Sequence, residues 1–511
     1  MALKIAFIGA GSIGFTRRLV HDLMAVPELR HAQIALTDIS KRNLDMVYRL
    51  VKRDLEANGV KTALTATTDR RAALKHANYV FSVVRVGWLE AFQHDIDIPL
   101  KYGVDQCVGD TLAPGGILYG QRNIPVILDF CKDIREVAAP GCVFMNYANP
   151  MAMNTWAANQ YGGVFTIGLC HGVHGSWWQI AEVLKVPMQE LDVTAAGINH
   201  QTWFISVKHR GKEMTPVLLE GFEKHPVFSK TEKTRIDVLR RFGYYSTESN
   251  GHLSEYVPWY RKRAKEIGKW IDLSSWINGE TGGYLRESKQ GRNWFVHDYP
   301  NWLKAAPPTF GPECRSAEHG SYIVEAMETG RIYRGFFNRP NGGIIANLPA
   351  DCIIEAPGYV DRNGLNMTVV GSLPLACAAT CNASISVQRM SVEAAVHGDL
   401  TLLKQAVLHD PLTAAVCDPP EIWQMVDEMV VAQAKWLPQY AKEIAGAKKR
   451  LATEKPLGTN KTRGAARLRE KTVADIEKDA AARTRAAAAD KAMDDRQAKA
   501  GKRAEAGTKA R

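Results

Sequence analysis

The sequence predicts an α/β protein whose first domain is a doubly wound parallel sheet, with helices on both faces, followed by a second α+β domain. Three observations support this fold class. Short apolar segments alternate with helix-like segments over the first 200 residues, a glycine-rich turn follows the first apolar segment, and the alternation later gives way to long helical stretches. A chain of 511 residues exceeds one ordinary core. We therefore expect domains at 1–194 and 195–445 and a tail at 446–511.

The expected elements follow in order along the chain. The strand-like segments of the first domain are KIAFIG, QIALTD, NYVFSVV, CVFMNYAN and VFTIGLC, and helix-like stretches such as residues 39–59 separate them. In the second domain we expect strands at GINHQTWFISVKH, GGIIANLP and CIIEAPGYV, and a closing helical region from about Gly371 to Lys442.

The positive charge of the chain is concentrated in its last 66 residues. Residues 446–511 carry 19 Lys and Arg against 9 Asp and Glu, so ten of the eleven net positive charges lie there. This tail contains no Phe, Trp or Tyr. Such a composition cannot bury enough apolar surface to offset its ordering entropy, so the tail is predicted to be a solvated extension that is partly helical or disordered. Without aromatic residues for base stacking, nucleic-acid binding is not expected.

The remaining composition indicates a soluble enzyme of a reducing compartment. The nine cysteines show no paired spacing, and several lie within apolar segments, which argues against a disulfide framework. No apolar run approaches the roughly 18 residues that a membrane span needs. We expect a cytoplasmic protein without membrane contact.

A dinucleotide site is indicated by the segment KIAFIGAGSIGF. Gly9, Gly11 and Gly14, with Ser12 among them, have the spacing that allows a tight turn, a pyrophosphate against bare backbone and close helix packing. The next strand ends at Asp38, whose carboxylate can accept hydrogen bonds from a ribose diol and would repel a 2′-phosphate. This favours NAD over NADP, although a turn that packs a helix without any ligand is the alternative.

Polar side chains follow the later strands of the first domain. Asn149 ends CVFMNYANP and Cys170 ends VFTIGLC, so both are expected at the edge of the sheet where the glycine loop lies. Cys170 and His200 are plausible ligands of a borderline divalent ion. Taken alone, the pattern favours an inert buried cysteine over a metal ligand. Likewise Asp110 could cap the following helix, and residues 244–260 could form an aromatic packing corner.

Seven segments in this order resemble glycoside hydrolase family 4, the NAD- and metal-dependent glycosidases, and within it the α-galactosidase branch most closely. They are FIGAGS, GDTLAPGGI followed by QRNIP, NYANPMAMNTWA, GLCHGV, AGINH, FGYYSTES with HLSEYVPW, and NLP near Asn347. The resemblance covers roughly residues 3–440 and excludes the tail. It implies a Rossmann-like fold of the lactate and malate dehydrogenase type.

The resemblance also implies an unusual hydrolysis. Most glycosidases use two carboxylates, whereas this family oxidises the sugar at C3 with NAD, removes the C2 proton, eliminates the leaving group, adds water and returns the hydride. Cys170 and His200 would hold Mn²⁺ or another divalent cation as a Lewis acid.

Other residues receive implied roles by the same resemblance. His171 is the candidate acid for the leaving group, and Asn149 would contact the substrate. Asp110 would contact sugar hydroxyls or the metal shell. The C2 base would be Tyr245 or its neighbour Tyr244.

The substrate remains open at this stage. The chain reads CHG at 170–172 and NHQTW at 199–203, and carries Ala113, where the α-galactosidase branch usually differs. An α-glucosidase or α-glucuronidase of the same family is therefore an alternative, as is a plain NAD-dependent hydroxy-acid or sugar dehydrogenase. The family implies a homodimer or homotetramer acting on a small α-glycoside.

Overall fold

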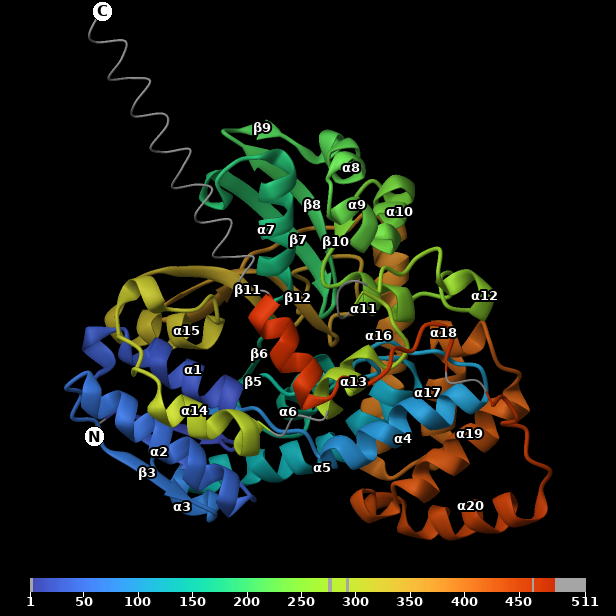
Figure 1. Cartoon of the computed structure of the whole chain (residues 1–511), viewed down its shortest axis with the longest axis horizontal. Helices are drawn as coiled ribbons and strands as arrows, with labels where there is room; N and C mark the ends of the chain where they lie inside the picture. Colours follow the sequence, from blue (N-terminus) through green and yellow to red (C-terminus); the bar gives the residue numbers. More distant parts are fainter. Residues whose placement is uncertain (1–2, 274–277, 291–293, 462–463, 483–511) are drawn as a thin grey trace, which may run out of the picture.

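The computed structural model describes residues 3–273, 278–290, 294–461 and 464–482 (Figure 1). Its first part is a six-stranded parallel sheet in the order β3-β2-β1-β4-β5-β6, the order of nucleotide-binding doubly wound folds. The strands are β1 (Lys4–Ile8), β2 (Gln33–Thr37), β3 (Leu64–Thr67), β4 (Tyr79–Ser82), β5 (Val143–Asn146) and β6 (Thr166–Gly168). All five predicted strands of this part are present, and β3 was not predicted.

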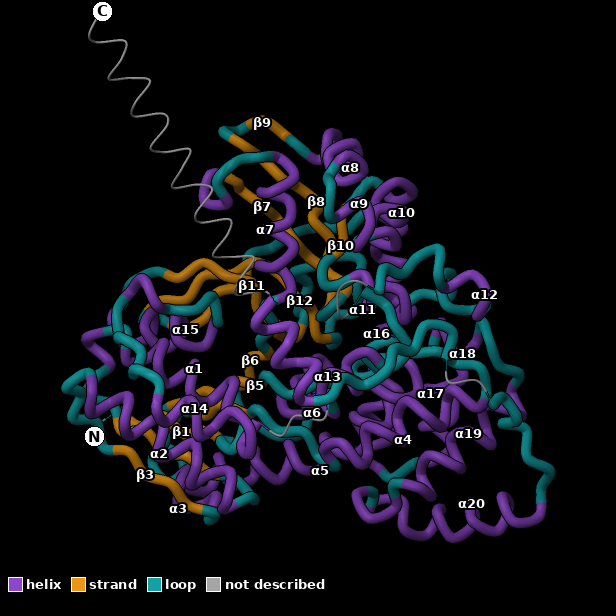
Figure 2. The backbone as a smooth tube through the Cα atoms, in the orientation of Figure 1, coloured by secondary structure: helices purple, strands orange, loops and turns teal. Residues whose placement is uncertain are grey.

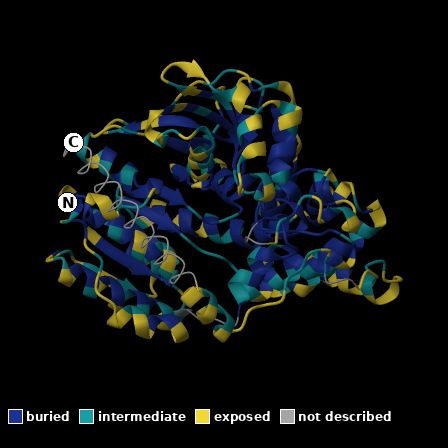
Figure 3. Cartoon of the chain, turned by 45° about the horizontal axis from the view of Figure 1, so that its top comes forward, coloured by how far each residue is buried: buried dark blue, intermediate teal, exposed yellow. Residues whose placement is uncertain are grey.

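Helices connect these strands and cover both faces of the sheet (Figure 2). They are α1 (Ile13–Met24), α2 (Lys41–Ala57), α3 (Arg70–Leu74), α4 (Trp88–Lys101), α5 (Ala113–Val137), α6 (Met151–Gln160) and α7 (Gly172–Leu184). Alternate residues of β1 show the two faces. Ile5 and Phe7 pack with α1 and α2, whereas Ala6 and Ile8 pack with α3 and α5. Burial on both faces explains why the strands read as continuous apolar runs, and the strands are dark blue in Figure 3.

The sheet continues past β6 into the second half of the chain with antiparallel strands. Asn338 of β11 pairs with Gly168 of β6, and the order then runs β11-β12-β7-β8-β10. These strands are β7 (Leu191–Ile198), β8 (Gln201–His209), β10 (Tyr245–Ser246), β11 (Tyr333–Pro340) and β12 (Ile353–Asp361), with β9 (Lys212–Glu213) and β13 (Gly364–Met367) pairing at the sides. The boundary expected at 194/195 falls inside β7.

Two strand predictions were wrong in detail. GINHQTWFISVKH is not one strand, because the chain reverses at residues 199–200 to form the β7–β8 hairpin. GGIIANLP forms turns rather than a strand, because the Asn341 side chain bonds the backbone of residues 345, 348 and 349 and curls the segment.

The second half also supplies the remaining helices. They are α8 (Thr215–Lys224), α9 (Phe228–Thr231), α10 (Lys233–Phe242), α11 (Asn250–Tyr256), α12 (Ala264–Ile267), α13 (Gly283–Lys289), α14 (Tyr299–Lys304), α15 (His319–Thr329), α16 (Leu375–His397), α17 (Leu400–His409), α18 (Pro411–Ala414), α19 (Pro419–Ala432) and α20 (Ala441–Thr453). The predicted closing helical region corresponds to α16–α19, which share an apolar core with α5 and α6. No helix in the described ranges combines the length and apolarity that crossing a bilayer requires.

The tail, expected to be solvated and partly helical or disordered, is partly helical where the structure describes it. Helix α20 extends to Thr453, and residues 473–482 are helical. Between them the chain crosses back to α4 and α13 and leads into the red helix of Figure 1. Polar bonds hold this segment together with Leu457, which packs against the main apolar core. Residues 462–463 and 483–511 lie outside the described part.

Candidate functional site

The predicted glycine loop lies at the carboxyl end of β1. Gly9 adopts φ +83°, and a Cβ there would stand 2.9–3.1 Å from Val83 and Val84. A Cβ on Gly11 would stand 2.8 Å from Asp38 Oδ2. These two positions therefore require glycine because of close approaches. A Cβ on Gly14 would meet nothing within 4 Å, so the expected packing role of that residue is not seen.

Asp38 is joined to this loop through both carboxylate oxygens. Oδ2 accepts the Gly11 N–H at 2.8 Å, and Oδ1 accepts the Ser40 N–H at 2.7 Å. Ser12 is the N-cap residue of α1, and its side chain forms no capping bond. The loop thus presents the amino end of α1 and an acidic residue at one edge of the sheet, an arrangement suited to a dinucleotide.

Cys170 lies two residues beyond β6, at the same edge. Its Sγ accepts the Gly172 N–H at 3.4 Å at the start of α7. Burial raises the pKa of this thiol well above its ordinary value, and Glu248 and Glu355 raise it further. A cation beside the thiol would oppose this shift, because a metal-bound cysteine is a thiolate.

His200 occupies the turn of the β7–β8 hairpin, with a left-handed backbone at φ +63°. Its Nδ1 lies 2.9 Å from Thr111 Oγ1 and 3.2 Å from the Tyr256 hydroxyl. Thr111 Oγ1 donates to Asp110, so it accepts the Nδ1 proton and leaves Nε2 available to a metal. Burial lowers the pKa of His200 to about 4, and the neighbouring His252 adds to the effect. The imidazole is therefore neutral near pH 7, as a ligand must be.

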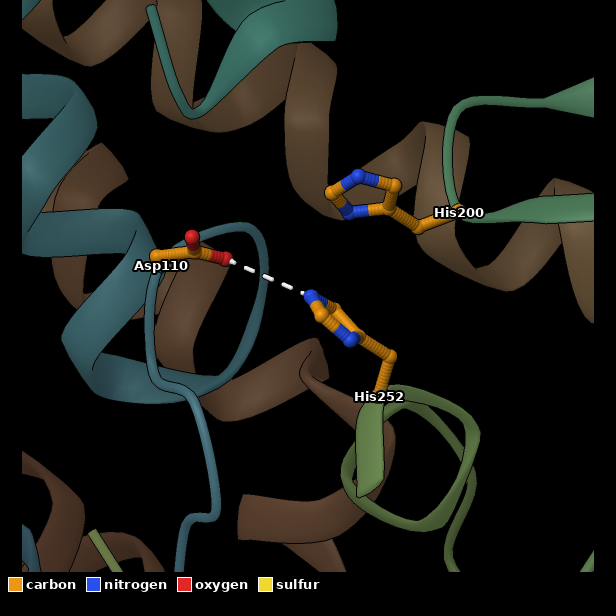
Figure 4. Close-up of side chains that lie close together, drawn as sticks. All are labelled: Asp110, His200 and His252. Carbon is orange, nitrogen blue, oxygen red and sulfur yellow. Dashed lines mark ion pairs between the residues drawn. The ribbon is translucent and has the colours of Figure 1, made fainter. Parts of the chain in front are cut away.

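Two residues that the sequence analysis missed complete the cluster. Glu248 joins Cys170 and His200 in a group whose ligand atoms all lie within 4.8 Å of one another. His252 and Asp110 form a second such group with His200 (Figure 4). Nearby histidines, His252 first, hold the pKa of Glu248 below its usual value despite its burial. The pattern E-x-x-x-H on the segment leading into α11 was the signal that could have revealed both.

Asp110 and Asn149, two of the predicted site residues, are hydrogen-bonded to each other. Asn149 Nδ2 donates to Asp110 Oδ2 at 2.8 Å, and His252 Nε2 lies 3.9 Å from Asp110 Oδ1. Asp110 does not cap α5, whose N-cap residue is Leu112. His171 follows Cys170 but has a side chain 61% exposed, with its Nδ1 3.7 Å from Glu318.

The predicted tyrosines, Tyr245 and Tyr244, pack in apolar cores, and within the described residues they form no hydrogen bond or ring contact with the ligand cluster. Tyr245 is fully buried in the apolar core beside α7, α8 and α10, where its ring stacks on Phe222 and its hydroxyl bonds Gln179 at 2.9 Å. Tyr244 packs against the other main core, half-buried. The two rings thus pack in two different apolar clusters. The tyrosine that contacts His200 is Tyr256.

The fold and the site define a protein with a nucleotide-binding sheet and a buried thiol, imidazole and carboxylate cluster at the edge of that sheet. Two sequence models match most of the chain: family 4 glycosyl hydrolase over residues 4–186, and the C-terminal domain of the same family over residues 195–413. The chain belongs to the family 4 glycosyl hydrolases, as its motifs predicted.

Named relatives agree with this membership. An α-galactosidase of Rhizobium meliloti is 62% identical, covering 94% of this chain and 98% of that protein. An α-galactosidase of Bacillus subtilis is 32% identical, covering 86% and 99%. The structure also matches a 6-phospho-β-glucosidase of Thermotoga maritima solved with manganese, NAD⁺ and glucose-6-phosphate, with TM-score 0.71, 22% identity and coverage of 85% of this chain and 99% of that one. This match confirms the predicted fold class.

Proposed function

We propose that this protein is an α-galactosidase that depends on NAD and on a divalent cation, Mn²⁺ by preference. The observation that carries the proposal is the group formed by the buried Cys170 and His200 with the partly buried Glu248, at the edge of the nucleotide sheet. The 62% identity to the Rhizobium α-galactosidase, over 98% of that protein's length, supports galactose as the sugar. An α-glucosidase or α-glucuronidase is the alternative within the family.

The residues present suit both NAD and a divalent cation. The backbone cradle at Gly9 and Gly11, which a Cβ would fill, is suited to the NAD pyrophosphate, and Asp38 to its adenosine ribose. A thiolate, a neutral imidazole and a carboxylate suit a borderline cation with positions left for sugar oxygens. The chemistry that these groups supply when bound is reversible oxidation at C3 of the sugar and Lewis-acid polarisation of the resulting carbonyl.

The side chains around the cluster then move the protons. We assign the C2 base to His252, because it is 6% exposed, lies beside His200 and faces both Glu248 and Asp110. Ser249 Oγ, 2.7 Å from His252 Nδ1, fixes the ring. Asp110 and Asn149, bonded to each other, contact the sugar hydroxyls. His171, exposed at the start of α7, protonates the leaving group.

We also propose a cellular compartment and an oligomeric state for the enzyme. All nine cysteines are free and eight are buried, which suits a reducing cytoplasm. We propose a homodimer or homotetramer, and light scattering on the purified protein measures this directly.

A panel of 4-nitrophenyl α-galactoside, α-glucoside and α-glucuronide, assayed with NAD, Mn²⁺ and a reductant, tests the function. We expect fastest hydrolysis of the galactoside, no net NADH, and solvent deuterium at C2 of the released sugar. Faster hydrolysis of another sugar would move the assignment within the family. Stoichiometric NADH without nitrophenol release would identify a dehydrogenase instead.

A further inference from the structure

The C-terminal extension returns to the loop that carries Asp110. Residues 455–460 run along α4 and α19, where the Leu457 N–H donates to Gln424 at 2.6 Å and the Asn460 N–H donates to the Lys101 carbonyl at 2.9 Å. Residues 464–467 then contact the segment that begins at Asp105. The family sequence models end before this extension, the first at residue 186 and the C-terminal-domain model at residue 413.

The contact is made by two backbone amides on buried polar groups. The Ala465 N–H donates to Asp105 Oδ2 at 3.1 Å, and the Ala466 N–H donates to Thr281 Oγ1 at 3.4 Å. Thr281 is fully buried and donates to Asp105 at 2.7–2.8 Å. Arg261, 1% exposed, pairs with the same carboxylate. A buried carboxylate is destabilising unless its oxygens accept hydrogen bonds. The extension supplies one of the hydrogen bonds that the Asp105 carboxylate accepts.

Gly464 allows the backbone of the extension to lie close to Thr281. It has φ +98°, and a Cβ on it would stand 2.2 Å from the Thr281 side chain. Further on, Arg467 Nη1 bonds Asp97 of α4 at 3.0 Å. Because this pair is partly exposed, it contributes less than the two buried amides.

The anchored loop leads directly to the site. After Asp105, the N–H groups of residues 107–109 all donate to Glu255 of α11, at 2.6–3.1 Å, and Asp110 follows. Glu255 immediately precedes Tyr256, which contacts His200. The loop is therefore held by α11 through Glu255 and by the extension through Asp105.

We infer that residues 464–467 form an anchor that positions the Asp110 loop, which makes the C-terminal extension a functional part of the enzyme. These residues act through Asp105 and Thr281, and they are positioning residues. The kinetic consequence of this inference rests on the proposed function, whereas the structural consequence does not.

The test uses two glycine substitutions in the full-length protein. Gly464→Ala places a methyl group against Thr281, whereas Gly446→Ala, in α20, has only the flexible Arg450 side chain within reach, at 3.4 Å. Amide hydrogen exchange is measured on the metal-free and NAD-free protein, and kcat and KM on the loaded enzyme. Gly464→Ala is expected to speed exchange of residues 105–112 by about tenfold and to lower kcat/KM by a similar factor, chiefly through KM. Gly446→Ala should change neither.

A second variant, Ala465→Pro, removes the N–H that Asp105 accepts and is expected to behave like Gly464→Ala. Wild-type exchange of residues 105–112 in both variants would overturn the inference, whether or not residues 464–482 exchange faster. If the wild-type chain hydrolyses none of the nitrophenyl glycosides, the proposed function fails, and the exchange data still decide whether the anchor exists.

Discussion

The glycine loop and the ligand cluster lie at the same edge of one sheet but are built in different ways. The loop takes its residues from one strand–turn–helix unit, joined to Asp38 at the end of the adjacent β2. The cluster gathers side chains from four separate segments, at Asp110, Cys170, His200 and 248–252. A local unit keeps its geometry through neighbouring backbone bonds, whereas the cluster depends on how distant segments pack. Substitutions in the cluster should therefore have the larger effects.

The largest effect is expected from Cys170→Ser. Loss of the thiolate should lower kcat/KM by about a hundredfold or more and weaken Mn²⁺ binding, because a hydroxyl does not ionise at neutral pH. The exposed Cys314 provides the matched control, since Cys314→Ser should leave both values unchanged. Undiminished turnover of the Cys170 variant would remove the metal assignment.

The next effect separates His252 from the tyrosine that the sequence suggested. His252→Gln should reduce kcat by about 10²–10⁴-fold, the usual contribution of a general base. Tyr245→Phe should change kcat by less than about threefold and cost about 1 kcal/mol of stability through the lost bond to Gln179. The reverse order of kcat values would restore Tyr245 as the base.

A smaller effect is expected at the nucleotide edge. Asp38→Ala should raise the Kd for NAD about tenfold, because a ribose acceptor and a partner of the Gly11 amide are lost together, with kcat nearly unchanged. Asp45→Ala, on the exposed side of α2, is the control. Isothermal calorimetry measures both, and equal Kd values would show that Asp38 does not contact the nucleotide.

The smallest effect concerns stability and pH. Burial raises the pKa of Glu355 to about 7 in the folded protein, against an ordinary value of 4.5. The folded state therefore holds a proton between pH 4.5 and 7 that the unfolded chain releases, and this contribution to stability is lost as pH rises through that window. Glu355→Gln cannot ionise, so its Tm relative to wild type should rise by about 2–4 °C from pH 5 to pH 8. A constant Tm difference would contradict the shifted pKa.

The sequence was sufficient for the parallel sheet, because each strand is buried on both faces and reads as a continuous apolar run. The exception is β3, whose residues are half-exposed and carry no such run. Cys170, His200, Asp110 and Asn149 were predicted because they follow strands or belong to compact motifs. Glu248 and His252 were not predicted, and Tyr245, the predicted base, packs in an apolar core, because the stretch from β10 into α11 is short and is irregular at residues 247–249. Which of its side chains face inward is decided by packing that sequence spacing does not encode.

The pairing of Gly168 with Asn338 joins the parallel and antiparallel halves of the sheet at one residue pair. Cys170 follows the last parallel strand, and His200 stands on the antiparallel hairpin, so an ion shared by the two would cross-link the halves beside their narrowest junction. Chelation should then loosen this junction as well as stop turnover. The enzyme would lose rigidity and catalysis in a single event.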